Sequence, residues 1–200
     1  MDIFKNIIKK LSGYKTPLQR LIDEGYVTVG NNSTVSGLKV IIKKKKKGVY
    51  LKIGDNSVIN GIIVFERENA RMEIGSDTFI GGGFFVAAEH IKIGNDVMFS
   101  WGCTVCDTNA HSITWEERKN DVKEWKKGLD ENKEGEYKNW NNITSKPIVI
   151  ADKCWIGFNS IILKGVSLSE ECVVGAGSVV TKSFDKKSII AGNPASFINK

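Results

Sequence analysis

The 200-residue sequence has no long apolar run and no secretory signal. No stretch approaches the roughly 18 consecutive apolar residues that a membrane-spanning helix needs. The opening segment mixes lysine with isoleucine and phenylalanine and contains no small-residue cleavage site, which excludes the pattern of a cleaved leader. We therefore expect a cytoplasmic protein without stable membrane insertion.

Histidine is scarce, and its scarcity limits the chemistry of the chain. There are 2 histidines, His90 and His111, so the chain lacks the three imidazole ligands of a carbonic-anhydrase type of zinc site. The sequence also has no GxSxG motif and no catalytic-cysteine signature, so nothing supports a covalent acyl-enzyme step.

The chain contains few cysteines, and their spacing gives only weak evidence for a metal site. Cys103 and Cys106 have the spacing of a zinc knuckle, but no second pair or histidines at ligand spacing accompany them. Cys103, Cys154 and Cys172 each fall at a compact position of the repeat described below. We therefore predict small core side chains and no metal site, and a cytoplasmic chain gives little reason to expect disulfides.

Positive charge is in excess, with a net charge of +6 and a pI near 9.0. This balance suits an acidic partner without choosing among nucleic acid, an anionic saccharide and a phosphorylated cofactor. The densest run, Lys43 to Lys47, lacks the interleaved aromatic residues of nucleic-acid modules. We expect no nucleic-acid partner and interpret the run as a solvated, irregular coil.

A six-residue repeat of aliphatic side chains runs through most of the chain. Its longest series contains Ile150, Ile156, Ile162, Leu168, Val174 and Val180. Earlier series contain Val29, Val35 and Ile41, then Ile53 and Ile59, then Ile74, Ile80 and Val86, then Ile93, Phe99 and Val105. A sandwich of short strands would break its pattern near every tenth residue. A period of six predicts a parallel β-helix instead, with the aliphatic residues inside, glycines at the turns and stability from stacked coils.

Residues 1–26 are predicted to form a helical cap on this solenoid. Thr16 has the sequence context of an N-cap, with Pro17 in the first turn, Gln19 completing a capping box and Gly25 ending the helix. An earlier amphipathic helix is expected from Ile3 to Leu11. A basic amphipathic segment of this kind could instead rest on a membrane surface. The repeat domain is assigned to 27–198.

The repeat stops between Val105 and Ile150, which predicts an extruded loop over 107–149. The loop begins with the sequence DTNAHSI, which contains Asp107 and His111, and it also contains Trp115, Trp125, Tyr137 and Trp140. A long interruption of a regular solenoid is usually functional or disordered. Three tryptophans in so short a segment require a surface to pack on, which favours function.

Several of these segments together resemble the hexapeptide-repeat, left-handed β-helix acyltransferases. They are DTNAHSI at 107–113, Trp155-Ile156-Gly157, Ile162-Leu163-Lys164-Gly165-Val166, the sequence from Val174 to Lys182, and the closing Ala191-Gly192-Asn193-Pro194-Ala195. The Asp-to-His segment followed by a tryptophan-containing insertion is most similar to O-acetyltransferases of cell-surface polysaccharides, including those that modify polysialic acid.

The resemblance implies a homotrimer with acetyl-CoA as co-substrate and three active sites at the subunit contacts. It implies that His111 is the catalytic base and that Trp140 approaches the reaction centre, with Trp115 and Trp125 as alternatives. It assigns Ala176, Thr181 and Lys182 to the coenzyme A groove, whereas Phe158 stands where galactoside enzymes have serine. Asp107 is a candidate for orienting His111.

The residues present suit this reaction, because transfer of an acetyl group to a hydroxyl requires a base that titrates near neutral pH, as an imidazole does. We expect an acetyl-CoA-dependent O-acetyltransferase that acts on a saccharide hydroxyl, such as one on a capsular or other surface polysaccharide. One alternative is an N-acetyltransferase of a nucleotide-linked amino sugar. A second is a β-helix scaffold or binding module without catalysis.

Overall fold

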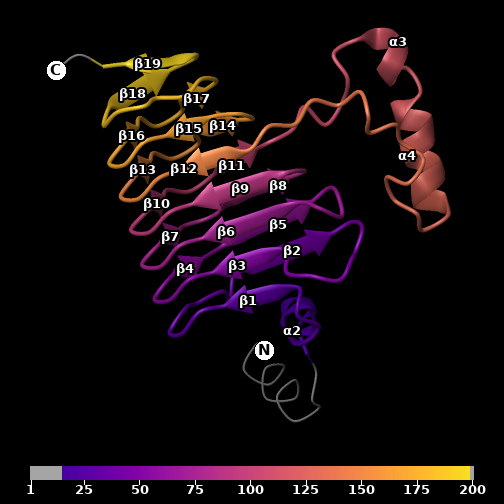
Figure 1. The fold of residues 1–200 in the computed structure, drawn as a ribbon, viewed down its shortest axis with the longest axis horizontal. Coiled ribbons are helices and arrows are strands. Elements are labelled where there is room, and N and C mark those ends of the chain that lie inside the picture. Colours follow the sequence, from indigo (N-terminus) through magenta and orange to yellow (C-terminus); the bar gives the residue numbers. More distant parts are fainter. Residues whose placement is uncertain (1–14, 199–200) are drawn as a thin grey trace, which may run out of the picture.

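The structure of the chain is a computed structural model that describes residues 15–198. The helix expected from Ile3 to Leu11 lies outside the described residues. The rest forms a left-handed parallel β-helix, in which the chain coils around a three-sided prism and each coil gives one short strand to each side (Figure 1). The predicted fold class is therefore confirmed. No helix in the described range is long and apolar enough to cross a membrane.

Three sheets form the sides of the prism, and we name them A, B and C in the order in which the chain visits them. Sheet A contains β1 (Val27–Val29), β3 (Leu51–Ile53), β6 (Arg71–Ile74), β9 (His90–Ile93), β12 (Ile148–Ile150) and β15 (Ser167–Leu168). Sheet B contains β4 (Val58–Ile59), β7 (Phe79–Ile80), β10 (Met98–Phe99), β13 (Trp155–Ile156), β16 (Val173–Val174), β18 (Ile189–Gly192) and β19 (Ala195–Phe197). Sheet C contains β2 (Leu38–Ile42), β5 (Gly61–Phe65), β8 (Gly83–Ala87), β11 (Cys103–Cys106), β14 (Ile161–Leu163) and β17 (Val179–Val180).

Aliphatic side chains fill the prism, and the members of one sheet stack directly on one another. In sheet B the buried column contains Ile59, Ile80, Phe99, Ile156, Val174 and Ile190. Each of these residues was expected inside except Ile190, which extends the series. No single coil can bury its own apolar face, so the stack is the source of stability.

The repeat pattern misassigns one position in each of two strands of sheet C. Phe85, rather than Val86, pairs with the buried Val105 and packs edge to face against Phe99, with ring centroids 5.6 Å apart. Val40, rather than Ile41, pairs with the buried Ile63. Side chains alternate between the faces of a strand, so a shift of one residue exchanges inside and outside.

The glycine that follows the inward aliphatic residue is required by close approach of neighbouring coils, as expected of a turn that a Cβ would crowd. A Cβ on Gly157 would lie 2.6 Å from the backbone nitrogen of Ala176 on the next coil. The left-handed backbone conformation belongs to other corner residues, among them Asn56 and Asp77, both with φ 55°. Asn and Asp tolerate this conformation better than most residues.

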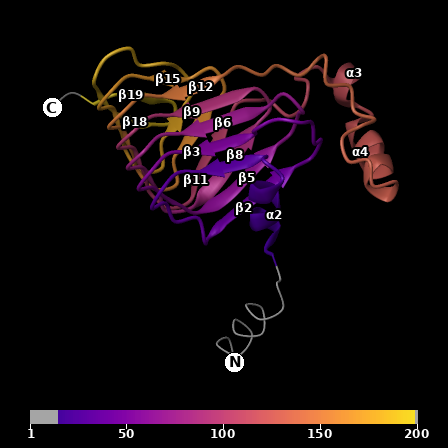
Figure 2. The same cartoon turned by 60° about the horizontal axis from the view of Figure 1, so that its bottom comes forward.

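The first described helix is α2 (Pro17–Asp23), and it begins as predicted. The backbone N–H of Gln19 donates to the Thr16 hydroxyl at 3.1 Å, and Gly25 adopts φ 77° after the last turn. The Gln19 side chain donates to Asp23 and does not close the capping box. Leu21 is buried and joins the core beneath β1 and β2, so α2 closes the first coil, as Figure 2 shows.

Cys103, Cys154 and Cys172 are buried free thiols, as expected of small core side chains. Burial raises the pKa of the Cys154 thiol to about 12. A thiol in this state is a poor nucleophile and a poor metal ligand at neutral pH.

Candidate functional site

The interruption of the repeat leaves the prism at the corner between sheets C and A and stands out to one side in both views (Figures 1 and 2). We call residues 108–147 the extruded hairpin. It contains two helices that the sequence did not predict, α3 (Trp115–Arg118) and α4 (Asp121–Asp130). Its two chains are joined at the base by a bridge between Thr108 and Ser145.

Asp107 anchors this base and does not orient His111. Its carboxylate accepts the backbone N–H groups of Ala88 at 2.7 Å and Glu89 at 2.9 Å. Its carbonyl oxygen accepts the N–H of Lys146 at 2.9 Å, which ties together the two ends of the extruded hairpin. Burial raises the pKa of the Asp107 carboxyl, although these backbone N–H groups oppose the rise. Asp107 is therefore a structural residue.

Asp121 is the carboxylate that contacts His111, and no sequence motif indicated it. Its Oδ2 lies 2.5 Å from Nδ1 of His111. As the first residue of α4, Asp121 also lies at the positive end of the helix dipole, where a carboxylate is favoured. The side chain of Asp121 is 7% exposed, whereas that of His111 is 56% exposed. The buried carboxylate thus holds one nitrogen of an imidazole that remains accessible.

The other ring nitrogen of His111, Nε2, has no hydrogen-bond partner among the described residues, and the ring borders a groove of about 350 Å³. The groove is lined by His111, Asp121, Val122, Trp125, Lys126 and Leu129. An oriented imidazole with a free nitrogen beside an apolar groove can act as a general base toward a bound hydroxyl or amine.

Lys138 is the third member of this cluster, and the sequence did not indicate it either. Its Nζ lies 3.3 Å from Oδ2 of Asp121 and 3.2 Å from Nδ1 of His111, and it also donates to the carbonyl oxygen of Ala110. Lys138 comes from the returning chain of the hairpin, 27 residues after His111. Only the folding of the hairpin brings the two together.

Two indole rings enclose the Lys138 ammonium. Its Nζ lies 5.0 Å from the ring centroid of Trp140 and 5.8 Å from that of Trp125. The Trp140 indole N–H donates to the carbonyl oxygen of Gly135 at 2.8 Å, which fixes the ring. Trp125 borders the same groove as His111, whereas Trp140 borders a separate cavity.

That second cavity, of about 360 Å³, lies below the extruded hairpin and is lined by Lys44, Glu66, Arg67, Glu68, Asn69, Ala88, Glu89 and Trp140. The neighbouring Lys43 is largely buried, with ion pairs to Glu66 at 2.8 Å and Glu134 at 3.5 Å. Its ammonium lies 4.2 Å from the Trp125 ring centroid. The start of the lysine run therefore braces the extruded hairpin, which differs from the solvated coil that we expected.

The predicted coenzyme A residues lie on the prism beside β16 and β17, which Figure 1 shows away from the hairpin helices α3 and α4. Ala176 lies at the corner between β16 and β17, and Thr181 and Lys182 follow β17 at the next corner. All three are exposed. Lys182 has no ion-pair partner among the described residues, so its ammonium is free to meet a phosphate.

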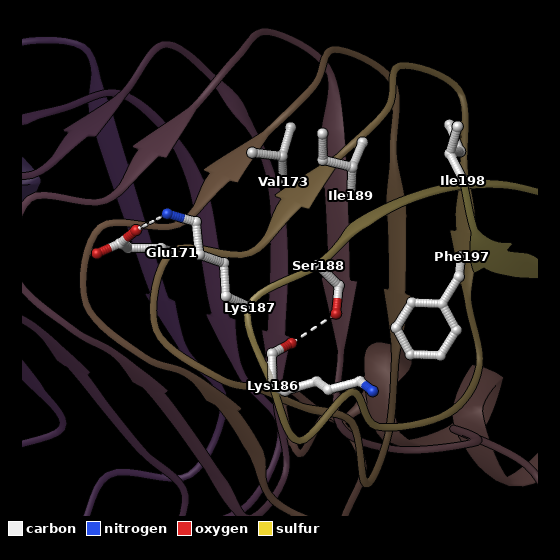
Figure 3. A pocket seen from close by; sticks show the side chains of 8 residues that line it. All are labelled: Glu171, Val173, Lys186, Lys187, Ser188, Ile189, Phe197 and Ile198. Carbon is white, nitrogen blue, oxygen red and sulfur yellow. Dashed lines mark hydrogen bonds and ion pairs between the residues drawn. The ribbon is translucent and has the colours of Figure 1, made fainter. Parts of the chain in front are cut away.

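A cavity of about 710 Å³ lies at the last coils, and the residues that line it include no histidine (Figure 3). Val173, Ile189 and Phe197 give it an apolar wall, and Lys187 is paired with Glu171 across its rim. His90, the other histidine, faces Glu73 on sheet A and lies outside both cavities near the hairpin. The chemistry therefore favours the groove beside His111, although it is smaller.

The chain was compared with known families and proteins. The family model described as the hexapeptide repeat of succinyl-transferase matches residues 147–182. No curated protein sequence matches the chain. The matched segment includes the longest series of the six-residue repeat, which the structure shows as the coils from β12 to β17.

Solved structures with the same fold extend the likeness over most of the chain. A variant of the N-acyltransferase AntD from Bacillus cereus, in complex with dTDP-4-amino-4,6-dideoxyglucose and coenzyme A, gives a TM-score of 0.65 at 20% identity, covering 92% of this chain and 88% of AntD. The polySia specific acetyltransferase NeuO gives 0.56 at 20% identity, covering 88% and 76%. A hexapeptide-repeat acetyltransferase from Vibrio cholerae gives 0.53 at 22% identity, covering 85% and 71%.

Proposed function

We propose that this chain, which has the left-handed β-helix fold of hexapeptide-repeat acyltransferases, transfers an acetyl group from acetyl-CoA to a saccharide hydroxyl. The observation that carries the proposal is the contact between His111 and the buried Asp121, which leaves Nε2 of an exposed imidazole free. The acyl-CoA complexes of AntD support a thioester as the acyl donor.

The reaction proceeds by direct attack. Nε2 of His111 removes the proton from the acceptor hydroxyl while the oxygen attacks the thioester carbonyl carbon. A C–O bond forms and the C–S bond breaks, and the proton passes from the imidazolium to the departing thiolate. A base of this kind contributes about 10² to 10⁴ in rate. Thr181, Ala176 and the unpaired Lys182 are proposed to hold the coenzyme, Lys182 through a phosphate.

His111→Ala is predicted to lower kcat/KM for acetyl transfer by about 10² or more, with an unchanged melting temperature. The matched control is His90→Ala, which removes the other histidine and is expected to retain activity because His90 faces Glu73 on sheet A. Full acetyl transfer by His111→Ala would exclude His111 as the base. A protein without acetyl transfer whose biological activity survives His111→Ala would be better interpreted as a scaffold or binding module.

A second candidate is N-acylation of a nucleotide-linked amino sugar, and the likeness to AntD favours it. The two reactions need the same base and the same donor, so the site alone does not separate them. Incubation with acetyl-CoA and paired amino and hydroxyl sugars, followed by mild alkali, distinguishes them because an ester is cleaved and an amide persists. A product that resists alkali would exclude the O-acetyltransferase.

A surface polysaccharide remains our proposal for the acceptor, on the basis of the resemblance to NeuO and of the net charge of +6. Trp140 is proposed to lie near the bound acceptor. Its ring packs against Lys138 beside His111, whereas Trp125 borders the groove itself and is the alternative.

A homotrimer is proposed because sheet B carries a column of apolar outward side chains, whereas the outward column of sheet A is mostly polar and charged. The outward column of sheet B contains Val58, Phe79, Met98, Trp155, Val173 and Ile189. The corresponding column of sheet A contains Thr28, Lys52, Glu73, Lys92, Val149 and Ser167. Trp101 and Phe158, at the corner between sheets B and C, are also exposed. A continuous apolar face of this kind favours a partner subunit.

A further inference from the structure

The burial of Lys138 requires an explanation beyond packing of the hairpin. Its side chain is 3% exposed, and the described chain surrounds it with a carboxylate, a carbonyl oxygen and two indole rings. Withdrawing an ammonium from water is unfavourable unless it is paired and hydrogen-bonded. These contacts satisfy Lys138, but they also place its positive charge beside the imidazole of His111.

The contacts define which nitrogen of His111 carries the proton. The 2.5 Å contact between Nδ1 and Oδ2 of Asp121 requires a hydrogen between two atoms that would otherwise repel each other. Asp121 is ionised because its pKa is lowered, so the hydrogen belongs to Nδ1. An ammonium has no lone pair to accept it, so Lys138 at 3.2 Å acts on Nδ1 by its charge. The neutral ring then has its lone pair on Nε2.

A carboxylate alone would make His111 a poor base at neutral pH. An adjacent negative charge favours the imidazolium form, which has already taken up the proton that a base must accept. A positive charge at a similar distance opposes the uptake of a second proton by the imidazole ring. The charged groups that face the ring are Asp121 on α4, Lys138 on the returning chain and Lys126 across the groove.

We infer that Lys138 is a positioning residue whose charge, set against that of Asp121, keeps His111 neutral with its free electron pair on Nε2. Asp121 orients the ring and fixes the tautomer, while Lys138 prevents the carboxylate from holding the ring as an imidazolium. The inference rests on the proposed role of His111 as the base, and it adds a residue that acts through His111 without contacting substrate.

The test uses the full chain labelled with ¹⁵N-histidine, whose 2 histidines give only two sets of ring signals. Wild type at pH 7 is expected to show His111 as the neutral Nδ1–H tautomer. Lys138→Met is expected to convert His111 largely to imidazolium at that pH, and kcat/KM to fall about tenfold at pH 6.5 and recover toward wild type at pH 9. His90 is the internal reference.

Two further variants separate charge from hydrogen bonding and from general damage. Lys138→Gln keeps N–H donors without the charge and is expected to behave as Lys138→Met does. Lys119→Met removes an exposed lysine of the same hairpin, whose ion pair among residues 15–198 is with Glu116 at 2.8 Å, and is expected to match wild type. If Lys138→Met fails to fold, Lys138→Gln provides the same readout with its donors retained.

The inference is overturned if His111 stays neutral in both Lys138 variants, or if their loss of activity is equal at every pH, as expected of a structural residue alone. It is also overturned if Lys138→Gln matches wild type, since the donors would then suffice. The ring signals need no acceptor or donor substrate. If the protein shows the expected ring signals but transfers no acetyl group, the proposed function is contradicted. The inferred effect of Lys138 on the charge of His111 is not contradicted by that result.

Discussion

At the scale of single residues, Asp121 illustrates how opposing effects set the charge of a buried group. Burial acts to raise the pKa of its carboxyl, but the hydrogen bond from His111 and the charge of Lys138 outweigh burial and hold the pKa below its usual value of 3.8. The carboxylate therefore stays ionised at all pH values at which the protein would work.

The lowered pKa of the Asp121 carboxyl makes the stability of the hairpin depend on pH in a definite direction. A depressed carboxyl pKa stabilises the fold at pH values above 3.8, and the effect is lost as the pH falls through the lowered value. Asp121→Asn is therefore expected to loosen the extruded hairpin at pH 7, and proteolysis of the hairpin measures this. The difference from wild type should persist down to pH 5, and a difference that vanishes by pH 5 would contradict the assignment.

At the scale of elements, the extruded hairpin is held by its two indoles and by a glycine between them. Gly135 has φ 75°, and a Cβ placed on it would lie 3.3 Å from the Trp140 ring and 3.4 Å from the Trp125 ring. Both rings enclose Lys138. The backbone of one residue therefore positions the aromatic rings around the Lys138 ammonium and the neighbouring His111.

Gly135→Ala is predicted to destabilise the hairpin, because the left-handed conformation costs about 1–2 kcal/mol without glycine and the rings must also move. Hydrogen exchange in α4 is expected to accelerate about tenfold, with little change in global unfolding, since a hairpin can open locally. Gly25→Ala is the control. It has the same strain at φ 77°, but nothing lies within 4 Å of its Cβ. An equal effect on α4 in both variants would show that ring packing is not involved.

At the scale of the whole molecule, the two kinds of prism face decide how copies of the chain can associate. Lys92, Met98 and Thr104 point outward from the same coil on sheets A, B and C. Only the residues on sheet B continue as an unbroken apolar column. A trimer that buries this column would leave the charged face of sheet A in water.

Met98→Glu is predicted to dissociate the proposed trimer, because the new carboxylate would be buried in an apolar contact without a partner. Light scattering should give three times the 22.1 kDa chain mass for wild type and the mass of a single chain for the variant. Lys92→Glu places the same side chain on the same coil and is expected to remain assembled. A wild-type protein that is monomeric at micromolar concentration would rule out the trimer.

The sequence predicts the coils well and the site only in part. The columns of sheets A and B follow from the spacing of aliphatic residues, but the pattern selects Val86 where Phe85 is inside. The corner from Ile80 to Gly83 is one residue shorter than the corresponding corner from Phe99 to Cys103, which shifts the register. His111 could be selected because it lies outside the repeat. Asp121 and Lys138 could not, because nothing in a charged, non-repeating segment indicates which of its charges will be buried.

The amino-acid sequence by itself determined the three-sided solenoid, since each coil must stack its aliphatic residues on the next to bury them. It also determined where the regular coil ends and an unusual segment with a histidine begins. Only the tertiary structure decided which charges surround that histidine. Asp121 and Lys138 reach His111 from a helix and from a returning chain, so their contact depends on how the hairpin packs around Trp125 and Trp140. Sequence spacing does not encode this packing, because it is set by the shapes of side chains that meet only after folding.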